Sequence, residues 1–347
     1  MANQNVTDCT IIGGGPAGLY AAFYAGMRDL SVRIIEVKEK LGGKLHFYPE
    51  KRIWDIGGMP PTLGADVMSY LMDQGKTFSP EINLNKKVTR INKINAQLFK
   101  VTSLNGEEFF SRSVIIATGG GIVSPKKLQA NQGQLFNQPN VHYTINRLND
   151  FKDRNVVIVG GGNSAIDWAN ELKEYAGSLH LIHRSDTFRA HESQLRQLKE
   201  SSVHIHSYTS IEDMELDEKR ESVQSITVKN SQTDQTYRLD CDDLIVNIGF
   251  EAEPNFHQEK EANLLLKDDY YIQGNSQTQT SVEGMYAVGD IVDYEGKVRL
   301  IAGAFNDAVN AVNQVKNHLN PESALPTVMS SFHKELQNRV HDSNSDN

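Results

Sequence analysis

Three glycines near the start of the chain have the spacing of a phosphate-binding turn. Gly13, Gly15 and Gly18 form the pattern G-x-G-x-x-G between an apolar run at 10–12 and a stretch of mostly small residues at 17–22. In such a turn the first glycine allows a tight bend, the second lets a pyrophosphate approach the backbone, and the third lets a helix pack closely on the strand. The N-terminus of that helix offers free N–H groups and the positive end of its dipole to an anion.

An acidic residue follows this turn where a nucleotide ribose would lie. Glu36 ends a second apolar strand, predicted at 31–36, 18 positions after Gly18. A carboxylate there accepts hydrogen bonds from the ribose hydroxyls of an adenosine and repels a 2′-phosphate. The first half of the chain is therefore predicted to bind FAD or NAD, and not NADP.

The same arrangement of strand, turn and helix recurs in the second half of the chain. Gly160 and Gly162 follow the apolar run 155–159, and Asn163, Ser164 and Ala165 continue the motif, with Ala165 in the third small position. Two such patterns in one chain favour two nucleotide-binding units.

The charge at the ribose position is reversed in this second pattern. The predicted strand at 179–182 is followed by His183 and Arg184, where the first half carries an acid, and Arg189 comes shortly after. Guanidinium groups bind a 2′-phosphate well, in bidentate fashion where geometry allows. These three residues predict selectivity for NADPH.

The remaining segments predict the elements that hold these motifs. Apolar strands at 113–118 and 244–249 close the two units, and another at 284–288 leads into Gly289 and Asp290. Asp290 is placed to hold the ribityl chain of FAD, beside a helix predicted at 302–316 whose N-terminus can face the flavin. The predicted fold class is α/β, with two Rossmann-like dinucleotide-binding domains of the three-layer ββα type. The expected domains are a discontinuous FAD domain (1–118 and 250–347) and an NADPH domain (119–249).

Composition excludes several other classes of protein. The chain has 44 acidic and 35 basic residues, a net charge of −9, which argues against general nucleic-acid binding. Its two cysteines, Cys9 and Cys241, form neither a CxxC motif nor a zinc-binding pattern. His204 and His206 alternate on a predicted strand, but no third ligand is near them in the sequence, so no metal site is expected. With no secretory signal or membrane-spanning run, the cytoplasm is the expected location.

Three stretches together resemble the thioredoxin-reductase-like branch of flavoprotein reductases: GGGNSA at 160–165, HRSDTFRA at 183–190 and AVGD at 287–290. The similarity extends from about residue 8 to residue 337. Thioredoxin reductases carry a CxxC early in the NADPH domain, whereas residues 122–163 contain no cysteine. Low-molecular-weight disulfide reductases place a cysteine in the first glycine motif, where this chain has Pro16 and Ala17. The chain is therefore most similar to the thiol-free ferredoxin (flavodoxin)–NADP(+) reductases.

This resemblance implies FAD and NADPH as cofactors, with hydride passing from NADPH to FAD and single electrons then passing to an external acceptor. Residues 41–51 resemble the segment that contacts the isoalloxazine. In it Tyr48 stacks on the flavin, and Tyr48 and Asp290 are the two predicted catalytic residues. Lys44 stands where many relatives have glutamine, and its charge is expected to stabilise an anionic reduced flavin and raise the flavin potential.

The resemblance also implies further flavin contacts and a homodimer. Val88 and Val123 are expected to contact FAD. A C-terminal extension is expected to cover the flavin of the partner subunit, with Ser330 or Ser331 supplying a hydroxyl and Met329 in the position of the stacking aromatic.

The expected partner is a small acidic electron carrier, ferredoxin or flavodoxin. Basic residues gather around the predicted flavin segment and would attract such a carrier: Lys38, Lys40, Lys44, Lys51 and Arg52. A haem-degrading oxygenase or a ferric chelate is an alternative acceptor. Two other functions stay open at this point, a low-molecular-weight disulfide reductase and a non-enzymatic NADP/FAD redox sensor.

Overall fold

The chain divides into two compact units in the computed structural model, which describes residues 5–128, 137–219, 221–253, 264–322 and 329–338. The first unit combines residues 1–46, 51–122 and 253–347, and the second combines 47–50 and 123–252. The first unit is thus assembled from both ends of the chain.

The first unit is built on a mixed sheet with the strand order β5-β2-β1-β8-β7-β6, and β21 also pairs with β8. The pairs β2–β5, β1–β2, β1–β8 and β8–β21 are parallel, whereas β6, β7 and β8 pair in antiparallel fashion. Its strands are β1 (Val6–Ile12), β2 (Val32–Ile35), β5 (Glu81–Asn83), β6 (Val88–Asn95), β7 (Leu98–Ser103), β8 (Glu108–Ile116) and β21 (Met285–Ala287). Every residue of β2 is buried, as expected of a parallel strand covered on both faces. Its one charged residue, Arg33, is paired with Glu81 at 2.8 Å and donates to the Phe110 carbonyl at 3.0 Å.

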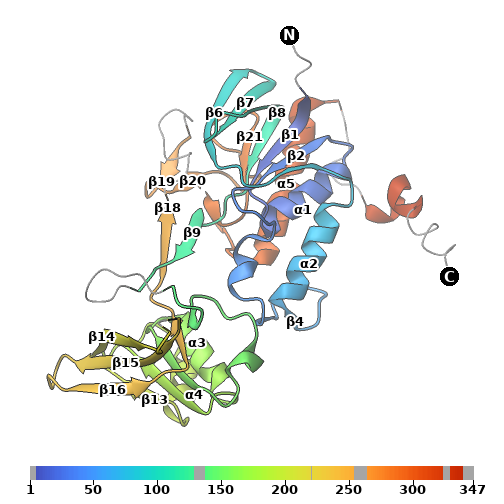
Figure 1. The fold of residues 1–347 in the computed structure, drawn as a ribbon. Helices are drawn as coiled ribbons and strands as arrows, with labels where there is room; N and C mark the ends of the chain where they lie inside the picture. Colours follow the sequence, from blue (N-terminus) through green and yellow to red (C-terminus); the bar gives the residue numbers. More distant parts are fainter. Residues whose placement is uncertain (1–4, 129–136, 220, 254–263, 323–328, 339–347) are drawn as a thin grey trace. The chain divides into compact units, whose positions relative to one another are not determined.

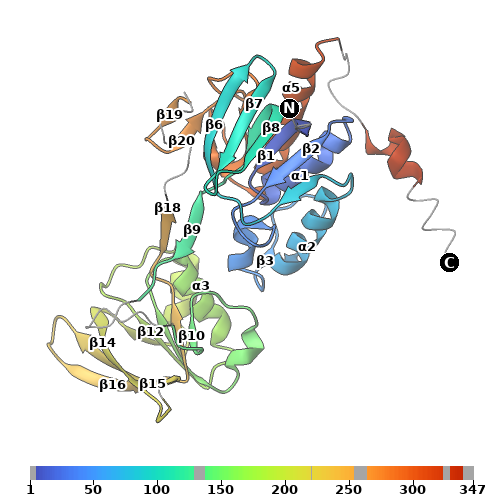
Figure 2. The same ribbon diagram turned by 45° about the horizontal axis from the view of Figure 1, so that its top comes forward.

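Helices and a second, smaller sheet complete the first unit. α1 (Pro16–Gly26) packs against α2 (Gly64–Gly75) and α5 (Ile301–Leu319), and Figures 1 and 2 show the three helices gathered beside β1 and β2. The small sheet consists of β19 (Leu266–Lys267), β20 (Tyr271–Gln273) and β22 (Val292–Asp293). Ile272 and Val292 of this sheet share one core cluster with Ile12 and Val114 of the large sheet. Helices, large sheet and small sheet form the predicted three layers.

The second unit has a fully parallel sheet in the order β10-β17-β11-β12-β13. Val156 and Ile158 face a core that includes residues of the helices, whereas Val157 faces a three-stranded antiparallel sheet, because successive side chains of a strand point to opposite faces. The elements of this unit are β10 (Val141–His142), β11 (Asn155–Val159), α3 (Asn163–Leu172), β12 (Ser178–Ile182), α4 (Glu192–Lys199), β13 (His204–His206), β14 (Thr209–Leu216), β15 (Val223–Asn230), β16 (Thr236–Asp240), β17 (Asp243–Val246) and the 3-10 helix η2 (Leu148–Phe151).

Short elements complete the chain. β9 (Ile122–Pro125) and β18 (Phe250–Glu253), where the chain passes from one unit to the other, pair as a two-stranded sheet, and β3 (Arg52–Ile53) pairs with β4 (Thr62–Leu63). Three 3-10 helices are relevant to the site: η1 (Gly43–Phe47), η5 (Gly289–Ile291) and η6 (Ser330–Phe332). Within the ranges given above, no helix is long and apolar enough to cross a membrane.

Candidate functional site

The first glycine turn has the shape that its sequence predicts. Gly13 has a φ of +109°, and a Cβ on Gly18 would lie 1.9 Å from the carbonyl oxygen of Gly13, so no side chain fits at the third position. A Cβ on Gly15 would meet nothing closer than the Cα of Gly43 at 3.6 Å, so packing does not require a glycine there. Gly15 is also the N-cap of α1 and provides no side-chain cap. Pro16, the first residue of α1, has no N–H, so the N–H groups that follow it are the ones available to a phosphate, and the turn fits a dinucleotide.

Glu36 closes this turn from the end of β2. Its side chain is buried, and its Oε2 accepts a hydrogen bond of 2.6 Å from the backbone N–H of Gly14, while Oε1 accepts one of 2.9 Å from that of Lys38. Each carboxylate oxygen has two lone pairs, so both can also accept from a ribose hydroxyl. The structure thus brings the predicted ribose-binding acid to the predicted phosphate-binding turn.

Asp290 and Lys44 form an ion pair in the first unit. Asp290 lies in η5, directly after β21, and its Oδ2 is 3.2 Å from the Nζ of Lys44 in η1. The two side chains are 39% and 44% exposed, so the pair is open to a ligand. Lys44 also lies beside Gly120. A Cβ placed on Gly120 would be only 2.7 Å from the Nζ of Lys44. The structure brings together two predicted flavin residues whose pairing the sequence did not predict.

The second glycine turn repeats the geometry of the first. A Cβ on Gly160 would lie 2.3 Å from the carbonyl oxygen of Asn247, whereas a Cβ on Gly162 would meet nothing within 4 Å. Gly162 is the N-cap of α3 without a side-chain cap, and Ala165 is fully buried in the third small position. The N-terminus of α3 is therefore also open to a phosphate.

The basic residues of the second unit lie beside this turn. The backbone N–H of Arg189 donates to the carbonyl of Gly161 at 2.7 Å, which ties its loop to the turn. The side chains of Arg184 and Arg189 are exposed, and neither has a hydrogen bond or ion pair with any other residue that the structure describes. Both guanidinium groups can therefore bind a phosphate without breaking an existing contact.

The neighbouring polar residues have more varied roles. The His183 ring covers Gly161, where a Cβ would lie 2.3 Å from it, and its Nε2 lies 3.0 Å from the Ser185 hydroxyl. Asn163 accepts a hydrogen bond of 3.3 Å from the backbone N–H of His191, and Ser164 is exposed at the start of α3. His183 is thus a packing residue of the turn as well as a neighbour of the predicted 2′-phosphate site.

The other predicted flavin residues are more scattered. Tyr48 is half-buried just after η1, and Val88 is buried at the start of β6. Val123 lies on β9, but its side chain is outside what the structure describes. Ser330 and Ser331 are exposed in η6.

The segment that carries η6 packs near the C-terminal end of α1. The neighbouring His333 ring packs against Phe78, with 5.0 Å between centroids. A Cβ on Gly26, the last residue of α1, would lie 2.3 Å from that Phe78 ring. This contact is at the C-terminal end of α1, whereas Gly15 is at its N-terminal end.

Both cysteines are buried and free. Cys9 lies on β1 of the first unit and Cys241 lies in the second unit. Burial raises the pKa of each thiol to about 12. Near neutral pH neither is a thiolate to a useful extent, and the thiolate is the nucleophile in disulfide chemistry.

Three histidines gather on the edge of the second sheet. The sequence suggested no third ligand for His204 and His206, but parallel pairing of β12 with β13 places His180 directly beside them, with 2.9 Å between its Nδ1 and the Nε2 of His206. The other ring nitrogen of His206, Nδ1, lies 2.7 Å from the Tyr237 hydroxyl, and the His204 ring stacks on that of His180. In the part of the chain that is described, no cluster of histidine, cysteine or acidic residues is arranged to hold a metal ion.

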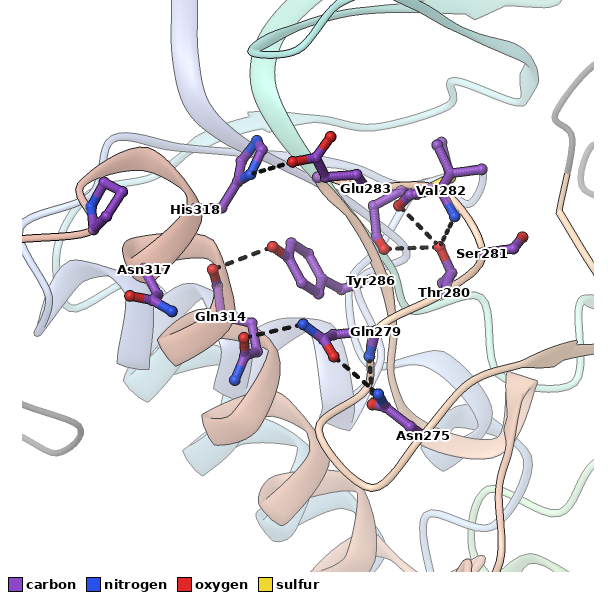
Figure 3. Close-up of a pocket in the computed structure, with 13 residues that line it drawn as sticks. Asn275, Gln279, Thr280, Ser281, Val282, Glu283, Tyr286, Gln314, Asn317 and His318 are labelled. Atoms are coloured by element: carbon purple, nitrogen blue, oxygen red, sulfur yellow. Dashed lines mark hydrogen bonds and ion pairs between the residues drawn. The ribbon is translucent and has the colours of Figure 1, made fainter.

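A surface cavity of about 630 Å³ lies elsewhere in the first unit (Figure 3). It is lined by the loop 275–284, the start of β21 and the C-terminal half of α5, and by none of the predicted site residues. Its amide side chains bond to one another, from Asn275 to Gln279 at 2.9 Å and from Gln279 to Gln314 at 3.3 Å. The cavity opens at the amino end of β21, whereas Asp290 follows its carboxyl end.

Comparison with known proteins supports a fold of two α/β domains, each with a dinucleotide-binding turn. The pattern of the pyridine nucleotide-disulphide oxidoreductase family matches residues 7–314, so the chain belongs to that family. Among solved structures, thioredoxin reductase from T. acidophilum covers 92% of this chain and all of its own, with a TM-score of 0.71 and 23% identity. Bacillithiol disulfide reductase from Staphylococcus aureus has a TM-score of 0.65 and 19% identity over 90% of this chain and 98% of its own. At these identities the similarity concerns the fold.

Closer relatives define the family more narrowly. Ferredoxin–NADP reductase 1 from Bacillus licheniformis is 43% identical over 339 residues, which cover 98% of this chain and 97% of the relative. Ferredoxin–NADP reductase 2 from Exiguobacterium sibiricum is 41% identical over 98% of this chain and 96% of its own. The chain therefore belongs to the ferredoxin–NADP reductase family. The predicted family, the fold class, the oxidoreductase activity and the cofactors FAD and NADPH are confirmed.

Proposed function

We propose that the protein is an NADPH-dependent flavoprotein reductase that passes single electrons from FAD to ferredoxin. The observation that carries the proposal is the pair of open glycine turns with opposite charges beside them. Glu36 lies at the first turn, and the exposed Arg184 and Arg189 lie at the second. The names of relatives that are 41% and 43% identical support ferredoxin as the acceptor.

In this proposal the first unit holds FAD and the second holds NADPH, with the domain boundaries expected from the sequence. The N–H groups at the start of α1 bind the FAD pyrophosphate and Glu36 binds its ribose. Asp290 orients the ribityl chain while Lys44 neutralises the carboxylate. The start of α3 binds the NADPH pyrophosphate, and the two arginines bind its 2′-phosphate. When bound, the two cofactors supply the hydride donor and a group able to release electrons one at a time.

The inert cysteines argue against the disulfide reductase alternative. Each thiol is buried in a different unit, so the chain provides no dithiol relay between the flavin and an external disulfide. Electrons must then leave the flavin directly, which favours a one-electron carrier.

The proposed setting is a cytoplasmic homodimer. The contact of His333 with Phe78 holds the C-terminal segment at the end of α1 that is remote from its own glycine turn. From there Ser330 or Ser331 would reach the flavin of a partner subunit. Flavodoxin is a second carrier that this arrangement would serve.

The proposal is tested by steady-state oxidation of NADPH with a panel of acceptors. We expect rapid turnover with ferredoxin, and slower or no turnover with ferric chelates, a haem-degrading oxygenase and low-molecular-weight disulfides. Rapid reduction of a disulfide would support the alternative enzyme class instead. Stopped-flow mixing with NADPH identifies the redox sensor alternative, because a sensor would be reduced without turning over with any acceptor.

A further inference from the structure

A buried ion pair lies directly behind the turn that carries Asp290. The Asp307 side chain, on α5, is 0% exposed, and that of Lys297, in the loop between β22 and α5, is 2% exposed. Two charges removed from water destabilise a protein unless they are paired and fully hydrogen-bonded. The contacts of this pair therefore show what it holds in place.

Asp307 accepts hydrogen bonds from three different groups. Its Oδ1 accepts one of 2.6 Å from the Tyr294 hydroxyl, and its Oδ2 accepts from the Lys297 ammonium and from the backbone N–H of Gly289, the latter at 2.9 Å. The Lys297 ammonium also lies 5.6 Å from the centre of the Tyr294 ring. Lys297 and Tyr294 thus hold the carboxylate in one orientation, and the backbone of Gly289 is the group it acts on.

Gly289 connects this buried pair to the cofactor site. It has a φ of +76°, and a Cβ at this position would lie 3.1 Å from the Cβ of Ala17, in the first turn of α1. The preceding Val288 donates its N–H to the carbonyl of Ile116 at 2.9 Å. Asp307 therefore fixes the peptide that follows the end of β21, and the next residue along the chain is Asp290, which pairs with Lys44.

We propose that Asp307 is a positioning residue of the FAD site, which fixes the Gly289 peptide so that Asp290 is presented to the flavin beside Lys44. Lys297 supplies the countercharge and Tyr294 sets the orientation. This inference rests on the proposed binding of FAD by the first unit. It assigns a role to three residues that no sequence motif indicated.

A purely stabilising role does not explain an ion pair at this place. Apolar side chains of similar volume often stabilise a buried site as well as an ion pair does, or better. With Lys297 also made apolar, an apolar residue at position 307 would lack an acceptor for the Gly289 N–H and for the Tyr294 hydroxyl. A loss of FAD affinity that a loss of stability elsewhere in the protein does not cause therefore distinguishes a positioning role of Asp307 from a purely stabilising one.

The test compares two double variants that both remove the buried charges. Lys297→Met with Asp307→Asn keeps an oxygen acceptor at position 307, whereas Lys297→Met with Asp307→Leu does not. We expect the leucine apoprotein to unfold at a lower temperature than the asparagine apoprotein, because the Gly289 N–H and the Tyr294 hydroxyl lose their acceptor. The affinity of the leucine variant for FAD, measured by the change in flavin fluorescence, is expected to be about fivefold weaker than that of the asparagine variant, the size of one lost hydrogen bond between neutral groups.

Asp243→Asn is the matched control, because it changes a buried aspartate of the second unit that binds Arg154 and His142. It is expected to lower stability and leave FAD affinity unchanged. Equal FAD affinity in the two double variants would overturn the inference while leaving the proposed function intact. Failure of the wild-type chain to bind FAD would instead contradict the proposed function.

Amide hydrogen exchange gives a second test that does not depend on the leucine variant. In the wild-type apoprotein the Gly289 N–H is expected to exchange as slowly as the amides of β8. Exchange as fast as in the exposed loops would show that Asp307 does not hold this peptide, and would overturn the inference.

Discussion

At the scale of single residues, the two glycine turns differ most in the charge beside them. Glu36 uses both oxygens to hold its own turn, so its position is fixed before any ribose binds. The side chains of Arg184 and Arg189 are exposed and make no hydrogen bond or ion pair with other described residues, so their guanidinium groups are free to follow a phosphate. The Glu36 carboxylate is thus fixed by hydrogen bonds within the fold, whereas no hydrogen bond from the described residues fixes the two guanidinium groups.

Replacing Arg184 and Arg189 together by serine should therefore weaken NADPH binding without affecting the fold. We expect KM for NADPH to rise about tenfold to a hundredfold, since the two exposed arginines together contribute about as much as one hydrogen bond to a charged group, roughly 1.5–3 kcal/mol, after screening by solvent. KM for NADH should stay nearly constant, because NADH has no 2′-phosphate. Steady-state kinetics with both nucleotides measure the difference.

Arg196→Ser is the control for this prediction, because Arg196 is also exposed but lies on α4. An equal loss of affinity for NADH and NADPH in the double variant would show that the arginines do not bind the 2′-phosphate.

At the scale of elements, the edge of the second sheet carries a stack of imidazoles. The rings of His180 and His204 lie 4.8 Å apart and those of His180 and His206 lie 5.2 Å apart. Burial, together with the nearby His206 and His204, lowers the pKa of His180 from 6.5 to about 4. Burial and the nearby His204 also lower the pKa of His206. The β12–β13 edge thus favours the neutral forms of His180 and His206.

This edge should make the second unit sensitive to acid. Between pH 6.5 and about 4 the unfolded chain binds a proton at His180 that the folded chain does not, so the free energy of unfolding falls as the pH falls. His180→Phe cannot bind that proton and should lose less stability over the same range. Urea unfolding midpoints measured from neutral pH down to pH 4 test this. If His180→Phe and the exposed control His191→Phe show the same pH dependence, the prediction is wrong.

At the scale of the whole molecule, a net charge of −9 coexists with basic residues around the predicted flavin segment. Arg52 is exposed on β3 and donates to the Pro61 carbonyl at 3.3 Å, and Trp54, two residues further on, is 73% exposed. An exposed tryptophan beside basic side chains is suited to contact with an acidic protein.

Reversing two of these charges should slow the reaction with an acidic carrier. For Lys51→Glu with Arg52→Glu, we expect the rate of ferredoxin reduction at low salt to fall about fivefold to tenfold and its salt dependence to flatten. Reduction of a small neutral acceptor should be unchanged. Lys152→Glu with Lys199→Glu, an equal change of charge at exposed positions of the second unit, is the control. An unchanged rate with ferredoxin would exclude this surface as the place of docking.

The sequence by itself determined the features that are encoded within a few neighbouring residues. The glycine turns, the acid or bases after the following strand, and the absence of a CxxC motif are local patterns, because a tight turn and a helix N-terminus require particular residues at fixed spacing. The central parallel strands β1, β8, β11 and β17 were also predictable, because burial on both faces favours continuous apolar runs. The edge strands β5 and β13 are not continuous apolar runs.

Only the tertiary structure decided which distant side chains meet. Lys44 pairs with Asp290 across 246 positions of the chain, and His180 joins His204 and His206 because β12 pairs with β13. Asp307 reaches the Gly289 peptide because α5 packs behind the end of β21. Such contacts depend on the register and packing of whole elements, and no spacing within one segment encodes them. The charge that will lie beside each cofactor is therefore set by packing as much as by motif.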